Sequence, residues 1–382
     1  MDLGSEYLRE CKSALRDIAT DYHVDACVAA AERRPMDPMP FYRLATACRA
    51  HALLALWKRG IDVALSRPHE TNEALYRRAH VRILQGDWGG WADFEARLFH
   101  PGWGCSESTI GTWRHSAWDG SESIVGRTLL IRSQGGFGDT ILMMRFVSLM
   151  FRRARRITME VAWELVDFVQ HNIGRLAAVI PNGESASVEC DRYLWSMSLP
   201  YIAGCLPPFV PCTAPAPWPR SEARAALRVG ICWATGIGGD HQPNRSIPLV
   251  ELTRLFQIDG VEWYNLQVGS EAAAGDRYAN LLRTQAPFRT FAHTANVVAG
   301  LDYVISADTA TCHLAGSLGV PTFLVLRYAS DFKWGLGDTT GWYPSMRIIR
   351  QPAPGDWSGA IDLLTGALRS AVHESRPAGI DR

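Results

Sequence analysis

The sequence lacks an excess of charge of either sign. Its 382 residues carry 39 lysines and arginines and 39 aspartates and glutamates, so the formal net charge is zero. Binding to nucleic acid regardless of sequence needs a basic surface that neutralises phosphates. The balance therefore argues against a nucleic-acid-binding protein, and the one dense basic run, Arg152 to Arg156, is interpreted as the close of a helix, where basic side chains suit the negative end of the dipole.

The sequence also lacks long hydrophobic runs and paired cysteines. No stretch reaches 18 apolar residues, so no membrane-spanning helix is predicted. The first ten residues are polar and acidic, without the apolar core of a signal peptide. The nine cysteines are scattered and form no C-x-x-C pair, which indicates neither a zinc site nor a disulfide framework. We expect a cytoplasmic protein with reduced thiols and without a metal.

Several common catalytic motifs are absent. The glycine turn at 134–138 is followed by no lysine, so there is no P-loop, and Ile141 occupies the position of the third glycine of a G-x-G-x-x-G fingerprint. Neither H-E-x-x-H nor G-x-S-x-G occurs. No Asp-x-Asp pair occurs either, which disfavours a sugar transferase that holds its nucleotide through a metal ion.

What the sequence does contain is enough apolar residues for several cores. Hydrophobic residues make up 47% of the chain and charged residues 20%, and the length suggests two or three domains. Residues 1–101 are predicted to be helical, because 41–57 and 73–85 carry apolar residues at helical spacing. Pro35, Pro68 and Pro101 recur every 33 residues, a period typical of helix-pair repeats. The alternative is a plain helical bundle.

The pattern changes after residue 101. Residues 102–127 are predicted to form a linker, and 128–205 to form a first half in which a strand at 127–132, a glycine turn and a helix at 139–151 open an α/β unit. A second strand is expected at 157–161, a helix at 163–172 and a third strand at 176–180.

A second α/β half is predicted at 226–372, after a proline-rich linker at 206–225. Its strands are expected at 227–233, 262–268, 302–306 and 322–326, and its helices at 250–256, 276–283 and 309–318. Strands that alternate with helices predict parallel sheets covered on both faces. Ligands of such sheets bind beyond the carboxyl ends of the strands.

Three clusters of residues are candidates for a site. In the first, Gly136 and Gly138 let the backbone approach a ligand, and Asp139 either acts chemically or only caps the following helix. In the second, Trp233 and Thr235 end a strand, and Arg245 on the next loop offers a planar fork that suits phosphate.

The third cluster follows a buried strand and opens a helix. Asp308, Thr309, Thr311 and His313 lie there, where free backbone N–H groups and the helix dipole favour an anion. Taken singly, Asp308 could be a helix cap and His313 a core histidine. An anion site and an arginine in one α/β half together indicate that the ligand is a diphosphate.

These motifs resemble bacterial tetratricopeptide-repeat (TPR) proteins with a heptosyltransferase-like domain of glycosyltransferase family 9. The matching stretches are GDWGGWADFEARL (86–98), WDG (118–120), GRTLLIRSQGGFGDTILMMRF (126–146), MSLP (197–200), VGICWAT (229–235), NRSIPL (244–249), YNLQ (264–267), SADTATCHLAGSLGVPTFLVL (306–326) and WYPSMRIIRQ (342–351). The resemblance implies TPR-like repeats followed by two Rossmann-like halves in a GT-B-like fold. It also implies inverting, metal-independent sugar transfer from a nucleotide sugar such as an ADP- or UDP-sugar, with no cofactor.

The resemblance also assigns roles. Asp139 would be the general base, Thr235 and Arg245 would hold the diphosphate, and Gln267 would lie near the nucleoside. Asp308, Thr309, Thr311 and His313 would line the donor site, and the repeats would bind a protein acceptor or partner. Two departures are the short first half and the absence of a histidine soon after Asp139. A catalytically degenerate scaffold protein and a nucleotide-sugar epimerase or hydrolase remain the alternatives.

Overall fold

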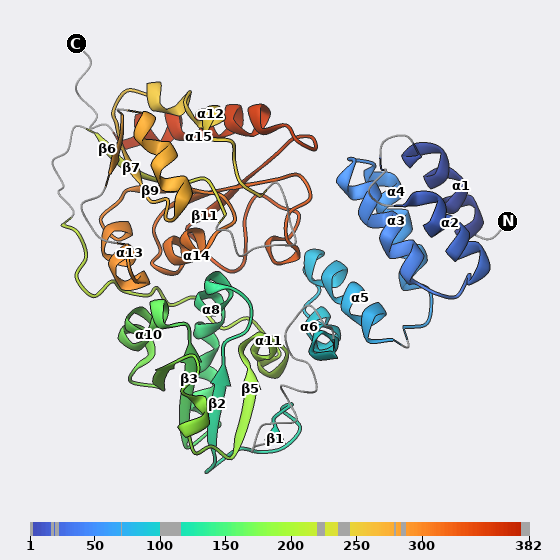
Figure 1. The fold of residues 1–382 in the computed structure, drawn as a ribbon, viewed down its shortest axis with the longest axis horizontal. Coiled ribbons are helices and arrows are strands. Elements are labelled where there is room, and N and C mark those ends of the chain that lie inside the picture. The colour runs from blue at the N-terminus through green and yellow to red at the C-terminus, as the bar shows by residue number, and fades with distance from the viewer. Residues whose placement is uncertain are drawn as a thin grey trace. The chain divides into compact units, whose positions relative to one another are not determined.

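The computed structural model describes most of the chain and divides it into two compact units. The first contains Met1–Trp113 together with Tyr328–Leu336 and Pro352–Gly355, and the second contains Arg114–Arg327, Gly337–Gln351 and Asp356–Arg382. Figure 1 shows the elements in chain order. The described residues are 3–16, 19, 23–69, 71–99, 116–219, 226–235, 245–278, 280–283 and 288–375, and the side chains of 186, 282 and 283 are not described.

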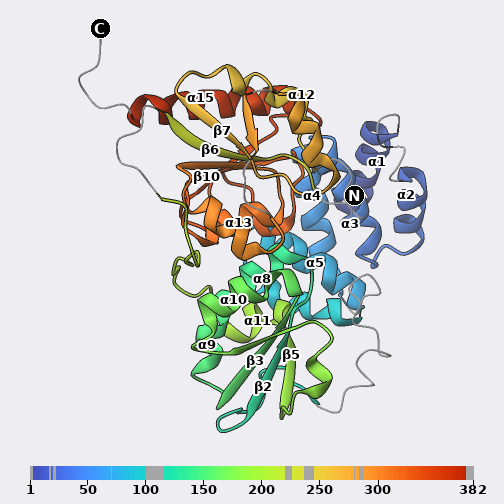
Figure 2. The same cartoon turned by 60° about the vertical axis from the view of Figure 1, so that its left-hand side comes forward.

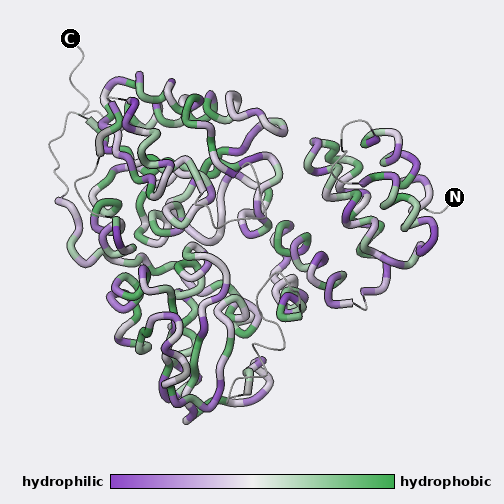
Figure 3. The backbone as a smooth tube through the Cα atoms, in the orientation of Figure 1, coloured by the Kyte–Doolittle hydropathy of each residue, from purple (hydrophilic) through white to green (hydrophobic). Residues whose placement is uncertain are grey.

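The first unit is built from helices, as predicted. They pack in consecutive pairs, and their bounds are α1 Leu3–Leu15, α2 Val24–Arg33, α3 Met39–Ala50, α4 Leu54–Leu65, α5 Asn72–Leu84 and α6 Gly90–Phe94, followed by the 3-10 helix η2 Glu95–Phe99. Hydrophobic and hydrophilic residues alternate along these helices (Figure 3), so that each helix buries one face. Pro35 and Pro68 follow the ends of α2 and α4, and the assignment of the pairs to the TPR family stays a prediction.

The region 41–57 is helical, as predicted, but it is divided between two helices. Its apolar spacing runs through two helices, because α3 ends at Ala50 and α4 begins at Leu54. Ala52 between them has a positive φ of 60°, which a continuous helix does not allow. The last part of the helical region is divided in the same way, between α6 and η2.

A short segment from late in the sequence completes the helical unit. Phe332, in the 3-10 helix η10 Phe332–Trp334, has its ring centroid 4.3 Å from that of His80 and 5.4 Å from that of Phe94. The predicted domain boundaries did not join this segment to the helices, because no local pattern in the sequence links residues so far apart.

The second unit contains two parallel sheets, which confirms the predicted α/β class. In the first sheet the order is β1-β5-β2-β3-β4, and every pair is parallel. The strands are β1 Ser116–Ala117, β2 Thr128–Arg132, β3 Arg156–Val161, β4 Ala178–Pro181 and β5 Arg192–Trp195. β1 lies within the predicted linker at 102–127, and β5 was not predicted.

Helices of the first sheet are short and often continue as 3-10 turns. The helix expected at 139–151 comprises α8 Phe137–Met143, η4 Met144–Phe146 and α9 Val147–Phe151. The next comprises η5 Trp163–Leu165 and α10 Val166–Ile173, and two short elements, η7 Ser196–Ser198 and α11 Leu199–Ala203, follow β5 after η6 Ser185–Ser187.

The second sheet has six strands in the order β11-β10-β9-β6-β7-β8, again all parallel. Numbered by chain order, this is the 3-2-1-4-5-6 arrangement of the Rossmann fold. The strands are β6 Leu227–Cys232, β7 Val261–Asn265, β8 Leu281–Arg283, β9 Tyr303–Ser306, β10 Thr322–Leu326 and β11 Met346–Arg350. The helix predicted at 276–283 is wrong: the 3-10 helix η9 Ser270–Arg277 and strand β8 occupy that region.

Helices cover both faces of the second sheet (Figure 2). On one face α12 Leu249–Leu252, the turn η8 Leu255–Gln257 and the long helix α15 Trp357–Ser375 pack on the strands, and on the other lie α13 Phe291–Val298 and α14 Ala310–Ser317. Both strand faces are therefore buried, which explains the continuous apolar runs of β9 and β10. No helix among the described residues is long and apolar enough to span a membrane.

Candidate active site

Each sheet of the second unit has one point at which its strand order reverses. In the second sheet this point lies between β6 and β9, where Cys232 is paired with Ser306. In the first sheet it lies between β2 and β5, where Arg132 is paired with Trp195. Ligands of open parallel sheets bind beyond the carboxyl ends of the strands at such points. All three predicted clusters begin directly after one of these four strands.

The loop after β9 leads into the start of α14. Thr309 is the N-cap residue, and its Oγ1 accepts a hydrogen bond from the Thr311 backbone N–H at 3.2 Å. The Ser306 hydroxyl lies 3.1 Å from the same oxygen and fixes its position. The start of α14 therefore presents a capped, positively polarised helix end at the point where the strand order reverses.

Arg245 lies beside this helix start, as the predicted diphosphate site requires. Its Nη1 is 3.5 Å from Oδ2 of Asp308, the residue just before the N-cap, and the two side chains are 23% and 6% exposed. Among the described residues, Arg245 Nε and Asp308 Oδ2 are buried without a hydrogen-bond partner. A buried, unsatisfied donor and acceptor are costly, so they mark a place where a polar ligand would complete the structure.

Thr235 and Gln267 hold the loop after β6. The Thr235 backbone N–H donates to Ser246 Oγ at 3.0 Å, which links this loop to the one that carries Arg245. The Gln267 amide oxygen accepts from the backbone N–H groups of Trp233 and Ala234 at 3.1 and 2.9 Å, and its Nε2 donates to the Ala234 carbonyl at 3.0 Å. The structure thus uses Gln267 to position the strand end rather than leaving its amide free for a nucleoside.

Trp233 and Cys232 contribute to this site through the backbone. The Trp233 side chain is 2% exposed and packs in the main core of the second sheet, so it cannot contact a ligand. Burial raises the pKa of the Cys232 thiol against smaller opposing effects of hydrogen bonds with Thr311, Thr309 and Ser306. The thiol therefore stays protonated near neutral pH and is not a nucleophile.

Asp139 lies in the first turn of α8, beyond the end of β2. Its Oδ2 accepts a hydrogen bond from the Gly136 N–H at 2.9 Å, which is the capping role considered from the sequence. Gly135 has φ +86°, and a Cβ there would lie 2.5 Å from Asp139 Oδ2. The glycine turn thus lets the backbone wrap closely around this half-buried carboxylate.

Gly138 brings the two Rossmann-like halves together. Helix α8 packs on α14, and a Cβ at Gly138 would lie 2.5 Å from His313 Cδ2. His313 is 2% exposed, and its Nδ1 lies 3.0 Å from the Tyr343 hydroxyl. The predicted donor-site histidine therefore lies at the contact between the helices that carry Asp139 and Thr309.

A second contact between the halves involves residues that the sequence analysis missed. Arg145, just after α8, donates to the Trp342 carbonyl at 2.6 Å and lies over the rings of Phe209 and Tyr343. Burial lowers the pKa of Arg145, against smaller opposing effects of Tyr343 and Cys212. Tyr343 thus connects Arg145 to His313. In the sequence, Trp342 and Tyr343 belong to the matching stretch 342–351, to which no role was assigned.

The start of α14 also gathers three potential metal ligands. Asp308, Cys312 and His313 are buried, and their ligand atoms lie within 4.8 Å of one another. Each already has a protein neighbour: Arg245 for Asp308, the Thr309 carbonyl for Cys312 and Tyr343 for His313. The sequence analysis expected no metal, and the adjacent guanidinium of Arg245 opposes a cation here.

Comparison with known proteins gives structural likeness only. No protein-family model matches the chain, and no curated protein matches it. The Escherichia coli heptosyltransferase WaaC, solved with ADP-2-deoxy-2-fluoro heptose, is 13% identical and covers 65% of this chain and 100% of its own, with a TM-score of 0.46.

Two further structures show likeness of the same or lower degree. A family 9 glycosyl transferase from Veillonella parvula is 9% identical and covers 67% of this chain and 99% of its own, with a TM-score of 0.46. An O-GlcNAc transferase mutant from Thermobaculum terrenum is 12% identical and covers 97% and 93%, with a TM-score of 0.29. Likeness this slight assigns neither an activity nor a substrate to the chain.

Proposed function

We propose that the chain is an inverting, metal-independent glycosyltransferase that moves a sugar from a nucleotide diphosphate sugar to a hydroxyl of a protein or glycan. One observation carries the proposal. Arg245, with a buried Nε that lacks a partner among the described residues, lies beside the N-terminus of α14 where the strand order reverses. A guanidinium and a helix amino end at this place form a site for a diphosphate.

The donor binds at the second sheet. Arg245 and the backbone N–H groups at the start of α14 receive the diphosphate, with the Thr309, Thr311 and Thr235 hydroxyls around it. Asp308, with its unsatisfied Oδ2, accepts a hydrogen bond from a hydroxyl of the sugar. An ADP- or UDP-sugar fits this arrangement, because its phosphate oxygens accept hydrogen bonds and its sugar hydroxyls can donate one to a carboxylate.

The transfer step places Asp139 on the acceptor side. The acceptor oxygen attacks the anomeric carbon and forms the new glycosidic bond, while Asp139 takes the proton of that hydroxyl. The bond between the anomeric carbon and the diphosphate oxygen breaks, and the leaving group keeps the electron pair. Arg245 and the start of α14 stabilise the negative charge that develops there. Attack opposite the leaving group inverts the configuration.

The test separates catalysis from folding with a matched pair of variants. Asp139→Asn keeps an oxygen that can accept from the Gly136 N–H, so α8 stays capped, but an amide cannot act as a base. Asp191→Asn is the control, because Asp191 accepts from the Thr128 backbone N–H at 2.7 Å near the opposite ends of the same strands. We expect Asp139→Asn to bind a donor normally and to lose at least about a hundredfold in turnover, and Asp191→Asn to retain turnover.

The donor is identified by thermal shift with ADP-, UDP-, GDP- and CMP-sugars. A ligand at about 100 times its dissociation constant adds roughly 2.7 kcal/mol of stability, which is easily measured. Arg245→Gln should abolish the shift. A shift that survives in Arg245→Gln, or no shift with any nucleotide, would overturn the donor site.

The alternative function is that of a scaffold protein that has the same fold but no catalytic activity. The short first half favours a scaffold that holds a nucleotide without transferring sugar and acts through its TPR-like helix pairs. Donor binding without turnover in the wild-type protein would support this alternative.

Turnover that persists in EDTA would support metal independence, whereas loss of turnover that zinc or iron restores would assign a metal to Asp308, Cys312 and His313.

The proposal places the protein in the cytoplasm, where thiols remain reduced. The eight cysteines among the described residues form no disulfide.

A further inference from the structure

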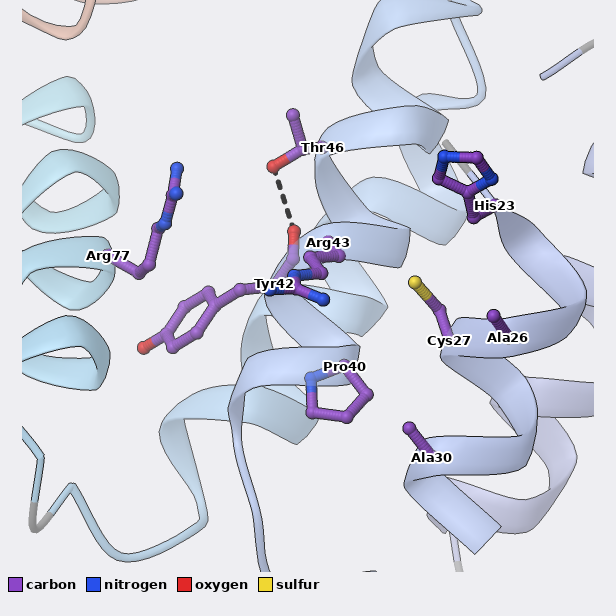
Figure 4. Close-up of a pocket in the computed structure, with 9 residues that line it drawn as sticks. All are labelled: His23, Ala26, Cys27, Ala30, Pro40, Tyr42, Arg43, Thr46 and Arg77. Carbon is purple, nitrogen blue, oxygen red and sulfur yellow. Dashed lines mark hydrogen bonds between the residues drawn. The ribbon is translucent and has the colours of Figure 1, made fainter. Parts of the chain in front are cut away.

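The helical unit contains a pocket that is separate from the proposed transfer site. It has a volume of about 470 Å³ and is lined by residues of three helices (Figure 4). Helix α2 contributes one wall, α3 the floor and α5 the facing wall, so the pocket includes one helix from each of three consecutive pairs. Sites of this size and position accept an extended side chain or a short segment.

The charged side chains among the described residues that line this pocket are both arginines. Residues 1–99 carry 14 lysines and arginines and 14 aspartates and glutamates, so the helical region as a whole is balanced. Among the described residues, the pocket is nevertheless lined by two arginines, Arg43 and Arg77, and by His23, and by no aspartate or glutamate. A cationic hollow in an otherwise balanced surface is complementary to carboxylates.

The two arginines come from different helices, and each already has one neighbour in the protein, Cys27 for Arg43 and Glu73 for Arg77. Arg43 on α3 is exposed, and no carboxylate among the described residues lies within ion-pair distance of it. Arg77 on α5 is 43% exposed and uses Nε to contact Glu73 at 2.8 Å, which leaves its terminal nitrogens for another acceptor. Two guanidinium groups, one on the floor and one on a wall of the pocket, can each bind a carboxylate with paired hydrogen bonds.

Between the charges the pocket offers an apolar surface and two hydrogen-bonding groups. Ala26, Ala30 and Pro40 supply the apolar part. The first group is the Tyr42 hydroxyl, which lies 2.7 Å from His69 Nε2. The second is the Cys27 thiol, whose pKa is raised by burial against smaller opposing effects of Arg43. The chemistry therefore suits a segment in which acidic and apolar side chains alternate, rather than a bare inorganic anion.

His23 at the rim holds a backbone conformation that its residue type rarely adopts. It has φ 48° and ψ 50°, in the left-handed region, directly before α2. Such a conformation costs free energy in a residue with a Cβ and persists where the surrounding structure fixes it. It places the imidazole at the edge of the pocket, where it adds a third group that can donate to a carboxylate (Figure 4).

We propose that this pocket binds an acidic segment of a partner protein, with carboxylates on Arg43 and Arg77 and an apolar side chain against Ala26, Ala30 and Pro40. This binding does not depend on the transferase chemistry. It would bring to the protein a partner or acceptor that presents glutamate or aspartate next to an apolar residue.

The experiment uses the full-length chain and a short fluorescein-labelled peptide of alternating glutamate and leucine, followed by fluorescence anisotropy. The double variant Arg43→Gln/Arg77→Gln removes the two pocket charges. Its matched control, Arg33→Gln/Arg34→Gln, removes two exposed arginines at the end of α2 that do not line the pocket. We expect the pocket variant to bind the peptide at least about tenfold more weakly and the control to bind as the wild type does.

Two companion probes make the result decisive. A peptide with lysine in place of glutamate should not bind, and a single-stranded oligonucleotide should bind more weakly than the acidic peptide. Absence of acidic-peptide binding, or an equal loss in both double variants, would overturn the proposal. Tighter oligonucleotide binding that the pocket variant alone abolishes would assign the surface to nucleic acid instead. Circular dichroism of both variants checks that the helices remain folded.

Discussion

Gly136 and Gly138 lie two positions apart in one turn but face different surroundings. At Gly136, φ is −86° and an added Cβ would meet only Asp139 Oδ2 at 3.8 Å, whereas at Gly138 it would lie 2.5 Å from His313 Cδ2. His313 is buried against Tyr343 and cannot easily move aside. We expect Gly138→Ala to lower the free energy of unfolding by about 1–3 kcal/mol and Gly136→Ala to change it by roughly 0.5 kcal/mol or less.

Urea unfolding of both variants measures this difference. Equal stability of the two would mean that α8 and α14 do not approach as closely as the structure shows. The result also bears on the sequence analysis, which gave both glycines a ligand-approach role. The structure explains Gly138 by the approach of another helix, which local sequence does not reveal.

Asp93 on α6 makes the stability of the helical unit depend on pH. It accepts hydrogen bonds from Arg78 Nε and Nη2 at 2.8 and 2.6 Å and from Arg82 Nη1 at 2.8 Å. Burial by itself would raise the pKa of Asp93, but the two arginines outweigh it and hold the pKa below its ordinary value. The carboxylate therefore stabilises the fold above the unfolded-state pKa of about 3.9 and loses this effect as the pH falls through its folded pKa.

The corresponding variant is Asp93→Asn. At pH 7 it should reduce the free energy of unfolding by about 1–3 kcal/mol. The difference from wild type should shrink as the pH falls below about 4, where the unfolded wild-type chain takes up the proton, and it should be lost below the lower folded pKa. Asp62→Asn, at an exposed position on α4, is the control and should change little. Thermal unfolding across this pH range provides the measurement, and a pH-independent difference would contradict the assignment.

At the scale of one element, α14 links stability to the proposed donor site. Thr309 caps the helix through its hydroxyl oxygen, so Thr309→Ala should cost about 1 kcal/mol. Thr309→Ser keeps the oxygen and should restore most of this stability. If the helix start also binds the diphosphate, the alanine variant should show a smaller thermal shift with the donor than the serine variant. Equal thermal shifts in the two variants would mean that the hydroxyl of Thr309 caps the helix but does not contribute to donor binding.

The elements also show what local sequence determines. The strands β2, β3, β6, β9 and β10 lie where their apolar runs predict them, because a strand buried on both faces needs a continuous apolar segment. β5 was missed, since RYLW is short and mixed, and it becomes a strand by pairing with β2. The region 276–283 was predicted as a helix, but pairing with β7 turns Leu281–Arg283 into β8. Tertiary pairing overrides local propensity in both places.

For the whole molecule, the sequence predicted which residues of the proposed donor site lie together better than it predicted the contacts of their side chains. Arg245, Asp308 and Thr309 are brought together as expected, because glycine turns and polar residues after buried strands share one sheet edge. The roles of Gln267 and Trp233 in holding the backbone and filling the core depend on which direction their side chains take from β7 and β6. That direction, and the contacts of Tyr343 and Arg145 between the halves, follow from three-dimensional packing alone.

The last prediction concerns how the helical unit is completed by a distant segment. Phe332 lies among His80, Trp91 and Phe94, with ring centroids 4.3 to 6.4 Å apart, and the Ser330 carbonyl accepts from Arg49 at 3.3 Å. A fragment of residues 1–99 lacks these contacts and should unfold at a lower temperature than the same helices in the full chain. In the full chain, Phe332→Ala should destabilise the helical unit by roughly 2–3 kcal/mol.

Hydrogen exchange localises the effect. Amides of α5 and α6, which carry His80 and Phe94, should lose protection in Phe332→Ala, because the ring that covers them is gone. Leu336→Ala is the matched control in the same segment, since Leu336 is 49% exposed and its loss leaves the rings covered. If both variants lose protection equally, the segment acts through its backbone, and if neither does, the helices hold together without it.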